Sequence, residues 1–165
     1  MPEVMRNLHE KKFDYADGEG IDFEPYSEFL PRDETEAWLR AWTGNDSLDG
    51  LEYRVFGQDG SGGYAAFWCV RPNTPVLEQP IVFFGSEGER AVIARNFADY
   101  LWLLAGGFGP YEACASPDTE RAANAEFEAF AAAHAESARK TAAATIAAAR
   151  GEFPQFDKLV AALCR

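Results

Sequence analysis

Histidine and cysteine side chains are the first candidates for chemistry in this sequence, and there are few of them. The chain has two histidines, His9 and His134, and three cysteines, Cys69, Cys114 and Cys164. A triad built on histidine or a histidine-rich metal site has little to draw on, and the cysteines lack the close spacing of metal ligands. We therefore predict no catalytic, cofactor-binding or metal-binding residues.

These side chains have simpler structural interpretations. His134 falls in an apolar helical stripe, where we expect a partly buried, hydrogen-bonded histidine, and His9 lies among the first dozen residues, which we expect to fray. Cys69 sits in a hydrophobic stretch with no general base beside it, which favours a small buried hydrophobe over a nucleophile. An odd cysteine count fits a reducing compartment. The 27 acidic residues could include an acid and base pair, but the sequence selects no two of them.

A glycine-rich run, Gly57–Gly63 (GQDGSGG), resembles a phosphate-binding loop only superficially. Such loops deliver their backbone amides into a following helix, whereas this run leads into a stretch with the composition of a strand. The run is instead typical of a tight turn. We expect Asp59 to be exposed on this turn, and Glu87 to be exposed on a similar turn further along.

Short aromatic and β-branched stretches on either side of these turns predict an antiparallel sheet. The stretches are residues 53–56, 64–70, 81–84 and 91–94, which form two hairpins. Phe67 and Cys69 would point to one face of the sheet, and Tyr64, Trp68 and Val70 to the other, so helices must cover both faces. We predict an α+β fold: a twisted antiparallel sheet of at least four strands flanked by helices.

Capping residues place two of these helices. Asp33 and Glu36 have the spacing of a capping box, so a helix should begin there and stop at Gly44. Asn96 and Asp99 can cap a second helix directly after the last strand. The core that these elements predict consists of Trp38, Trp42, Phe67, Phe84, Ile93, Phe97, Leu101 and Leu104.

The remaining sequence is rich in alanine and has no glycine between Pro110 and Gly151. Ser116 and Pro117 are a good helix start, and one long helix is expected from there, followed by a short helix over residues 154–163. Its apolar stripe would be Phe127, Phe130, His134, Ala138, Ala142 and Ile146. We predict one domain over residues 1–165, with a core of about residues 20–110 and a C-terminal helical extension over about residues 113–165.

The charge of the chain is strongly negative and unevenly spread. The net charge is -12, with a sequence pI of about 4.5, so binding to a nucleic-acid backbone is not expected. The segment Asp14–Glu36 holds nine acidic residues against a single base, Arg32. It is either a solvated face with a helix N-terminus or a strip that docks a basic partner. The sequence has no apolar run of membrane-spanning length and no signal-peptide pattern, so we expect a cytoplasmic protein without membrane contact.

The central block resembles a known family in the order of its pieces. The run 53–68 (YRVFGQDGSGGYAAFW) is followed by 80–89 (PIVFFGSEGE) and by 94–107 (ARNFADYLWLLAGG). This succession is similar to that of the SUKH superfamily, which includes the yeast cell-wall assembly regulator and many bacterial immunity proteins. The resemblance covers about residues 20–110, and the alanine-rich tail looks like an extension that some members carry.

The resemblance implies a protein-binding module without catalysis, most often an immunity protein that neutralises a toxin domain, many of which are nucleases. Strong negative charge is what a binder of a basic enzyme needs. A regulatory module of the same fold with no toxin partner, or an uncharacterised enzyme, stays open as an alternative. Our candidates for partner contact are Asp17, Glu19, Asp22, Glu24, Asp59 and Glu87.

Overall fold

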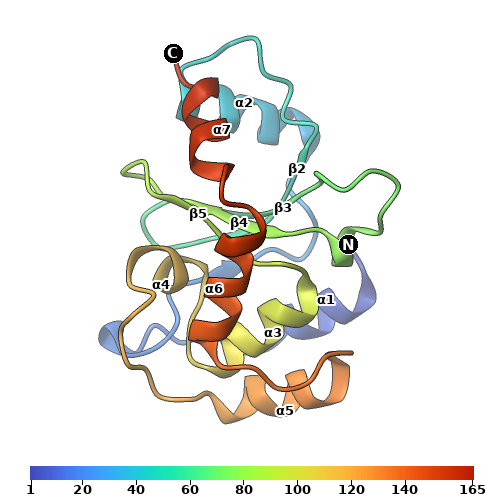
Figure 1. Ribbon diagram of the computed structural model, residues 1–165, viewed down its shortest axis with the longest axis vertical. Helices are drawn as coiled ribbons and strands as arrows, with labels where there is room; N and C mark the ends of the chain where they lie inside the picture. The colour runs from blue at the N-terminus through green and yellow to red at the C-terminus, as the bar shows by residue number, and fades with distance from the viewer.

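An antiparallel sheet of five strands lies between two layers of helices in the computed structural model, which describes residues 1–165 (Figure 1). The strands follow one another across the sheet in sequence order: β1 (Glu24–Pro25), β2 (Tyr53–Gln58), β3 (Tyr64–Trp68), β4 (Ile81–Phe84) and β5 (Arg90–Ala94). Every neighbouring pair is antiparallel. The α+β fold and both predicted hairpins are therefore confirmed, and β1 is an additional short edge strand.

Seven α-helices and two short 3-10 turns surround the sheet. The helices are α1 (Glu3–His9), α2 (Arg32–Thr43), α3 (Phe97–Ala105), α4 (Pro110–Ala115), α5 (Ala125–His134), α6 (Ala142–Glu152) and α7 (Phe156–Leu163). The 3-10 turns are η1 (Ala16–Gly18) and η2 (Val76–Glu78). Figure 1 shows α2 and α7 on one side of the sheet and α1, α3 and α5 on the other.

Alternating side chains of the strands build two cores, one on each face. Phe67 belongs to the larger core, with residues of α1, α3, α4 and α5, and its neighbour Trp68 belongs to the smaller core under α2 and α7. Both faces are covered, as the sequence predicts. Of the predicted core residues, all are buried except Trp38 and Trp42, which are partly buried and pack edge-on against Phe84.

Helix α6 lies against the edge strand β5 and connects the two layers. Its residues Ala142 and Ile146 belong to the larger core, and Ala149 belongs to the smaller one. Because β5 pairs only with β4, its other edge would be open without this helix. The alanine side chains let the helix approach closely, so the predicted extension is part of both cores.

Helix α2 begins at Arg32, next to the predicted start at Asp33, but the predicted capping box is wrong. Pro31 occupies the cap position and offers no side-chain hydrogen bond, so Asp33 lies inside the first turn. Glu36 does not reach back to close a capping box; its carboxylate pairs with Arg40 at 2.7 Å, one turn further on. The predicted stop is confirmed, since Gly44 has a φ of 66°, a left-handed conformation that suits glycine.

The single long alanine-rich helix is also wrong, because this stretch forms two helices, α5 and α6, whereas the predicted short helix that follows is confirmed as α7. Ser116 ends α4 instead of starting a helix. The side chain of Asn124 caps α5, and that of Thr141 caps α6 by accepting from the amide of Ala144 at 3.1 Å. Alanine favours a helix but does not fix its length, so the caps and the tertiary contacts decide where each one stops.

The N-terminal residues do not fray as predicted. Helix α1 places Met5 and Leu8 fully inside the larger core. Packing of this apolar face stabilises a helix that is too short to be stable alone. None of the helices in the structure combines the length and the apolar character that a membrane span requires.

Candidate functional site

Four of the predicted partner-binding acids lie along the chain that leads into the edge strand β1. We call Asp17, Glu19, Asp22 and Glu24 the acidic edge. None of the four forms an ion pair, in contrast to other acids of the same segment. Asp17, Glu19 and Glu24 are exposed, and Asp22 is half-buried. Their charge is therefore uncompensated within the molecule.

The other acids of the segment show the contrast. Asp14 pairs with Lys12 at 2.7 Å. Glu28 pairs with the N-terminal amine at 3.0 Å and with Arg6 at 2.9 Å. Because such pairs consume charge locally, the free charge of the segment is concentrated on the acidic edge and on the start of α2.

Hydrogen bonds fix the strand end of the acidic edge. Gln58 of β2 donates from Nε2 to Glu24 Oε2 at 3.0 Å, and its Oε1 accepts from the hydroxyl of Tyr26 at 2.8 Å. Burial raises the pKa of Tyr26, and the contact with Tyr64 and the carboxylates of Glu24 and Glu34 raise it further. Glu34 at the start of α2 therefore lies near the same phenol as Glu24.

An arginine that is distant in the sequence holds the backbone next to Asp17 and Glu19. Arg121 donates to the carbonyl oxygens of Glu19, at 3.2 Å, and of Gly20, and also to that of Gly107 at 2.7 Å. Asp17 itself has a φ of 53°, the left-handed region. The loop is thus ordered by backbone contacts, while its carboxylates remain exposed.

A buried glutamate that the sequence does not single out supports the next residue. Glu112 of α4 accepts from the amide of Asp22 at 2.9 Å and from that of Gly109 at 3.0 Å. Burial raises the pKa of this carboxyl, although these hydrogen bonds act in the opposite direction. Asp22 in turn accepts from the amide of Gly60 at 2.8 Å, which joins the acidic edge to the glycine-rich turn.

The expected exposure of Asp59 is wrong. Its side chain is only 2% exposed and folds inward over its own turn. Asp59 Oδ1 accepts from the amides of Ser61 at 2.9 Å and Gly63 at 2.7 Å. An aspartate in such a turn satisfies backbone donors that strand pairing leaves free, so it is a structural residue here.

Glu87 is exposed on the β4–β5 turn, as expected. The hydroxyl of Ser86 donates to that of Ser61 at 3.1 Å, so the two hairpin turns touch. Since Asp22 also contacts the first turn, Glu87 and the acidic edge share one end of the sheet. The structure therefore links the turn that carries Glu87 to Asp22 of the acidic edge through the first turn, and it removes Asp59 from the surface.

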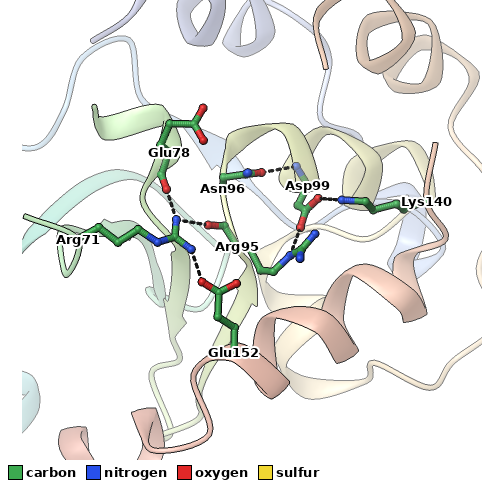
Figure 2. Close-up of polar contacts among 7 residues, drawn as sticks. All are labelled: Arg71, Glu78, Arg95, Asn96, Asp99, Lys140 and Glu152. Carbon is green, nitrogen blue, oxygen red and sulfur yellow. Dashed lines mark hydrogen bonds and ion pairs between the residues drawn. The ribbon is translucent and has the colours of Figure 1, made fainter. Parts of the chain in front are cut away.

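A buried carboxylate forms the strongest charge cluster elsewhere in the molecule (Figure 2). Asp99 accepts from Arg95 Nε at 2.7 Å and from the ammonium of Lys140, and its side chain is 1% exposed. Burial alone would raise the pKa of Asp99, but the hydrogen bonds from both cations outweigh it, so this pKa is lowered. The predicted cap is confirmed as well, since Asn96 accepts from the amide of Asp99 at 2.9 Å.

A second part of this cluster holds the β3–β4 connection against α6 (Figure 2). Arg71 donates to the carbonyl oxygens of Glu78 and of Arg95, the latter at 3.0 Å, and pairs with the carboxylate of Glu152 at 2.5 Å. The Arg71 side chain thus contacts three separate segments of the chain, so its role is to join elements. No local sequence pattern predicts these contacts.

The residues with catalytic potential are dispersed. His9 is half-buried with Nδ1 2.6 Å from the carbonyl oxygen of Tyr26, and burial lowers its pKa. His134 is exposed, contrary to the expected partial burial, because α5 ends at this residue. Cys69 is half-buried, and burial raises the pKa of its thiol; the same effect raises the pKa of Cys114 to about 11. No three His, Cys, Asp or Glu side chains are grouped to hold a metal ion.

Comparisons with protein-family models, with curated proteins and with solved structures found no match to this chain. The resemblance of the central block to the SUKH superfamily therefore stays a prediction.

Proposed function

We propose that this protein is a cytoplasmic, non-catalytic binding module of the immunity type, which docks a basic toxin domain through the acidic edge. The observation that carries this proposal is the set of four carboxylates that no cation of the chain neutralises. Arg121 and Glu112 hold the backbone of this segment, and Gln58 holds the carboxylate of Glu24, so docking does not require the segment to be ordered first.

Charge of this kind acts mainly on the rate of encounter. A surface of one sign attracts a partner of the other sign and speeds association, and salt screens the effect. A domain that cleaves nucleic acid must carry a basic groove, because it binds phosphates. Carboxylates of the acidic edge can take the place of those phosphates and block the groove.

The proposal predicts a toxin domain encoded beside this protein's own gene, and that domain supplies the test. Association of the two purified proteins is measured by stopped flow over a salt series, for the wild type and for a variant with D17N, E19Q, D22N and E24Q together. The amides keep an acceptor oxygen and remove the charge, so the fold is retained. We expect slower association and a shallower dependence on salt in the variant, and weaker protection of cells that express the toxin.

A matched control removes four charges elsewhere. Glu3, Glu10, Asp46 and Glu136 are exposed and take part in no ion pair or side-chain hydrogen bond. The variant E3Q, E10Q, D46N and E136Q has the same net charge as the test variant. If the two variants had equal association rates, the acidic edge would be an ordinary solvated surface with no role in docking. Absence of any binding to the neighbouring toxin would reject the immunity role.

A further inference from the structure

A cleft of about 510 Å³ opens beside the start of α2, between β2 and the β3–β4 connection. Its volume is within the range of small-molecule sites. Three arginines line it, Arg32, Arg54 and Arg71, and no carboxylate does. In a chain with 27 acids and 15 bases, this is a local reversal of charge.

Two of these arginines have no counter-ion. Nine of the 15 Lys and Arg side chains form ion pairs, but Arg32 and Arg54 form neither an ion pair nor a side-chain hydrogen bond. Arg54 instead lies over the ring of Phe29, with the guanidinium carbon 5.1 Å from the ring centre. Stacking of this kind holds the guanidinium in place and leaves its N–H donors free.

The far wall of the cleft is preorganised by a buried amide. Gln79 is 2% exposed, donates to the carbonyl oxygens of Arg71 at 2.6 Å and Thr74 at 3.2 Å, and accepts from the amide of Arg71 at 2.9 Å. Since Arg71 also bonds to Glu152 and two carbonyl groups, the β3–β4 connection cannot close over the cleft without losing these contacts. A fixed wall lowers the entropic cost of binding a ligand.

Apolar side chains complete the cleft. Phe29, Leu51 and Val76 line it, and Leu51 is 56% exposed, a large exposure for a leucine. A ligand that fits must therefore combine negative charge with an apolar or flat body. Two guanidinium groups without counter-ions match a doubly charged phosphate better than a single carboxylate.

A second cleft, beside α6, has no cation that is free of a partner. It measures about 430 Å³ and is lined by both acids and bases. Its three cations are already engaged: Arg121 with backbone carbonyls, Arg139 with Glu128, and Lys140 with Asp99. No cation without a partner remains there to recognise an anion.

We propose that the arginine-lined cleft binds a small organic phosphate, of which a nucleotide is the nearest common example. The phosphate lies between Arg32 and Arg54, and the organic body rests on Phe29, Leu51 and Val76. This site is separate from the acidic edge and does not depend on the proposed toxin partner.

Titration calorimetry with adenosine 5′-diphosphate, in low salt with a chelator present, tests the site. We expect saturable binding by the wild type and at least about a tenfold loss of affinity in R32Q and in R54Q, because each removes a charge-assisted contact. R54K should bind less well than the wild type, since lysine lacks the planar fork. Inorganic phosphate and adenosine, each alone, should bind more weakly than the diphosphate.

The control variant is K158Q with R165Q, which removes two other cations that form no ion pair. It should bind like the wild type. Should R54Q unfold through loss of its contact with Phe29, R32Q still decides the question, since Arg32 is exposed and packs on nothing in the core. Absence of saturable binding, or equal affinities in wild type and R32Q, would overturn the proposal. If inorganic phosphate bound as tightly as the diphosphate, the apolar side chains would not contribute to binding, and that part of the proposal would be rejected.

Discussion

Lys140 donates a hydrogen bond to the buried carboxylate of Asp99, forty-one residues earlier in the chain. The contact joins the connection between α5 and α6 to the first turn of α3. A carboxylate that is 1% exposed needs partners of opposite charge, because burial of an unpaired charge is costly. Lys140 and Arg95 supply them, so the charge of one loop determines how the alanine-rich segment attaches to the core.

Replacement of Lys140 by methionine should lower the free energy of unfolding by about 1.5–3 kcal/mol, the range for hydrogen bonds to charged groups. The lowered pKa of Asp99 stabilises the fold above the unfolded-state pKa, and this contribution is lost as pH falls toward the folded-state pKa. In K140M the folded-state pKa of Asp99 lies closer to its unfolded-state pKa, so this acid-dependent loss should be smaller. Urea denaturation over a pH series measures both effects, with K158M as the exposed control; identical curves for K140M and K158M would contradict the assignment.

Truncation of Phe84 to alanine should cost about 3–5 kcal/mol, as for other buried phenylalanines. Phe84 is fully buried and makes edge-on contacts with Trp38, Trp42, Tyr53 and Phe156, so it joins α2 and α7 to the sheet. Thermal and urea denaturation measure the loss. Leu159→Ala, at a position that is 51% exposed, should change stability little. A similarly small change in F84A would contradict the assignment of Phe84 to the core.

Asp59→Ala should destabilise the protein by about 1–3 kcal/mol, because the buried amide of Gly63 and the amide of Ser61 lose their acceptor. Asp59→Asn keeps one acceptor oxygen and should lose less. Ser61→Ala is the control, since it removes only exposed hydroxyl contacts with Asp59 and Ser86 and should cost less than Asp59→Ala. Chemical denaturation measures the free energy of unfolding of the three variants. An Asp59→Ala variant as stable as the wild type would mean that the turn does not need its aspartate.

His9 should make the fold sensitive to mild acid. Its Nδ1 hydrogen donates to the Tyr26 carbonyl, and its Nε2 is buried without a partner, so the folded state resists a second proton. Because its folded-state pKa is lowered below 6.5, stability is fully present above that pH and declines as pH falls below 6.5 toward the folded-state pKa. His9→Gln should flatten this decline in urea denaturation, whereas His134→Gln, at an exposed position, should retain it. A retained slope in both would assign the titration to another group.

Local signals in the sequence predict much of the fold. The hairpins follow from strand composition around glycine-rich turns, and the start of α3 follows from the Asn96 cap, because each depends on residues close together in the chain. Helix α1 was missed because its stability comes from Met5 and Leu8 packing into a distant core. The division of the alanine-rich segment was missed since the contact of Lys140 with Asp99 is long-range, although Asn124 and Thr141 were available as cap signals.

The sequence also predicts only part of the proposed binding surfaces. The acidic edge was visible as a run of acids, but only the structure shows which of them lack a cation. The predicted exposure of Asp59 is wrong, because composition does not tell whether a turn aspartate faces solvent or its own backbone. The arginine-lined cleft assembles Arg32, Arg54 and Arg71 from a helix, a strand and a loop, so no spacing in the sequence reveals it.

Helix α6 protects the outer edge of β5 only once it has docked there. The strand and its cover are separated in the chain by α3, α4 and α5, so the sheet can pair fully while its outer edge is still bare. In that intermediate the free N–H and C=O groups of β5 are a template for a strand of another molecule. Docking of α6 competes with self-association at this edge, and the yield of native monomer from a refolding mixture should therefore fall as protein concentration rises.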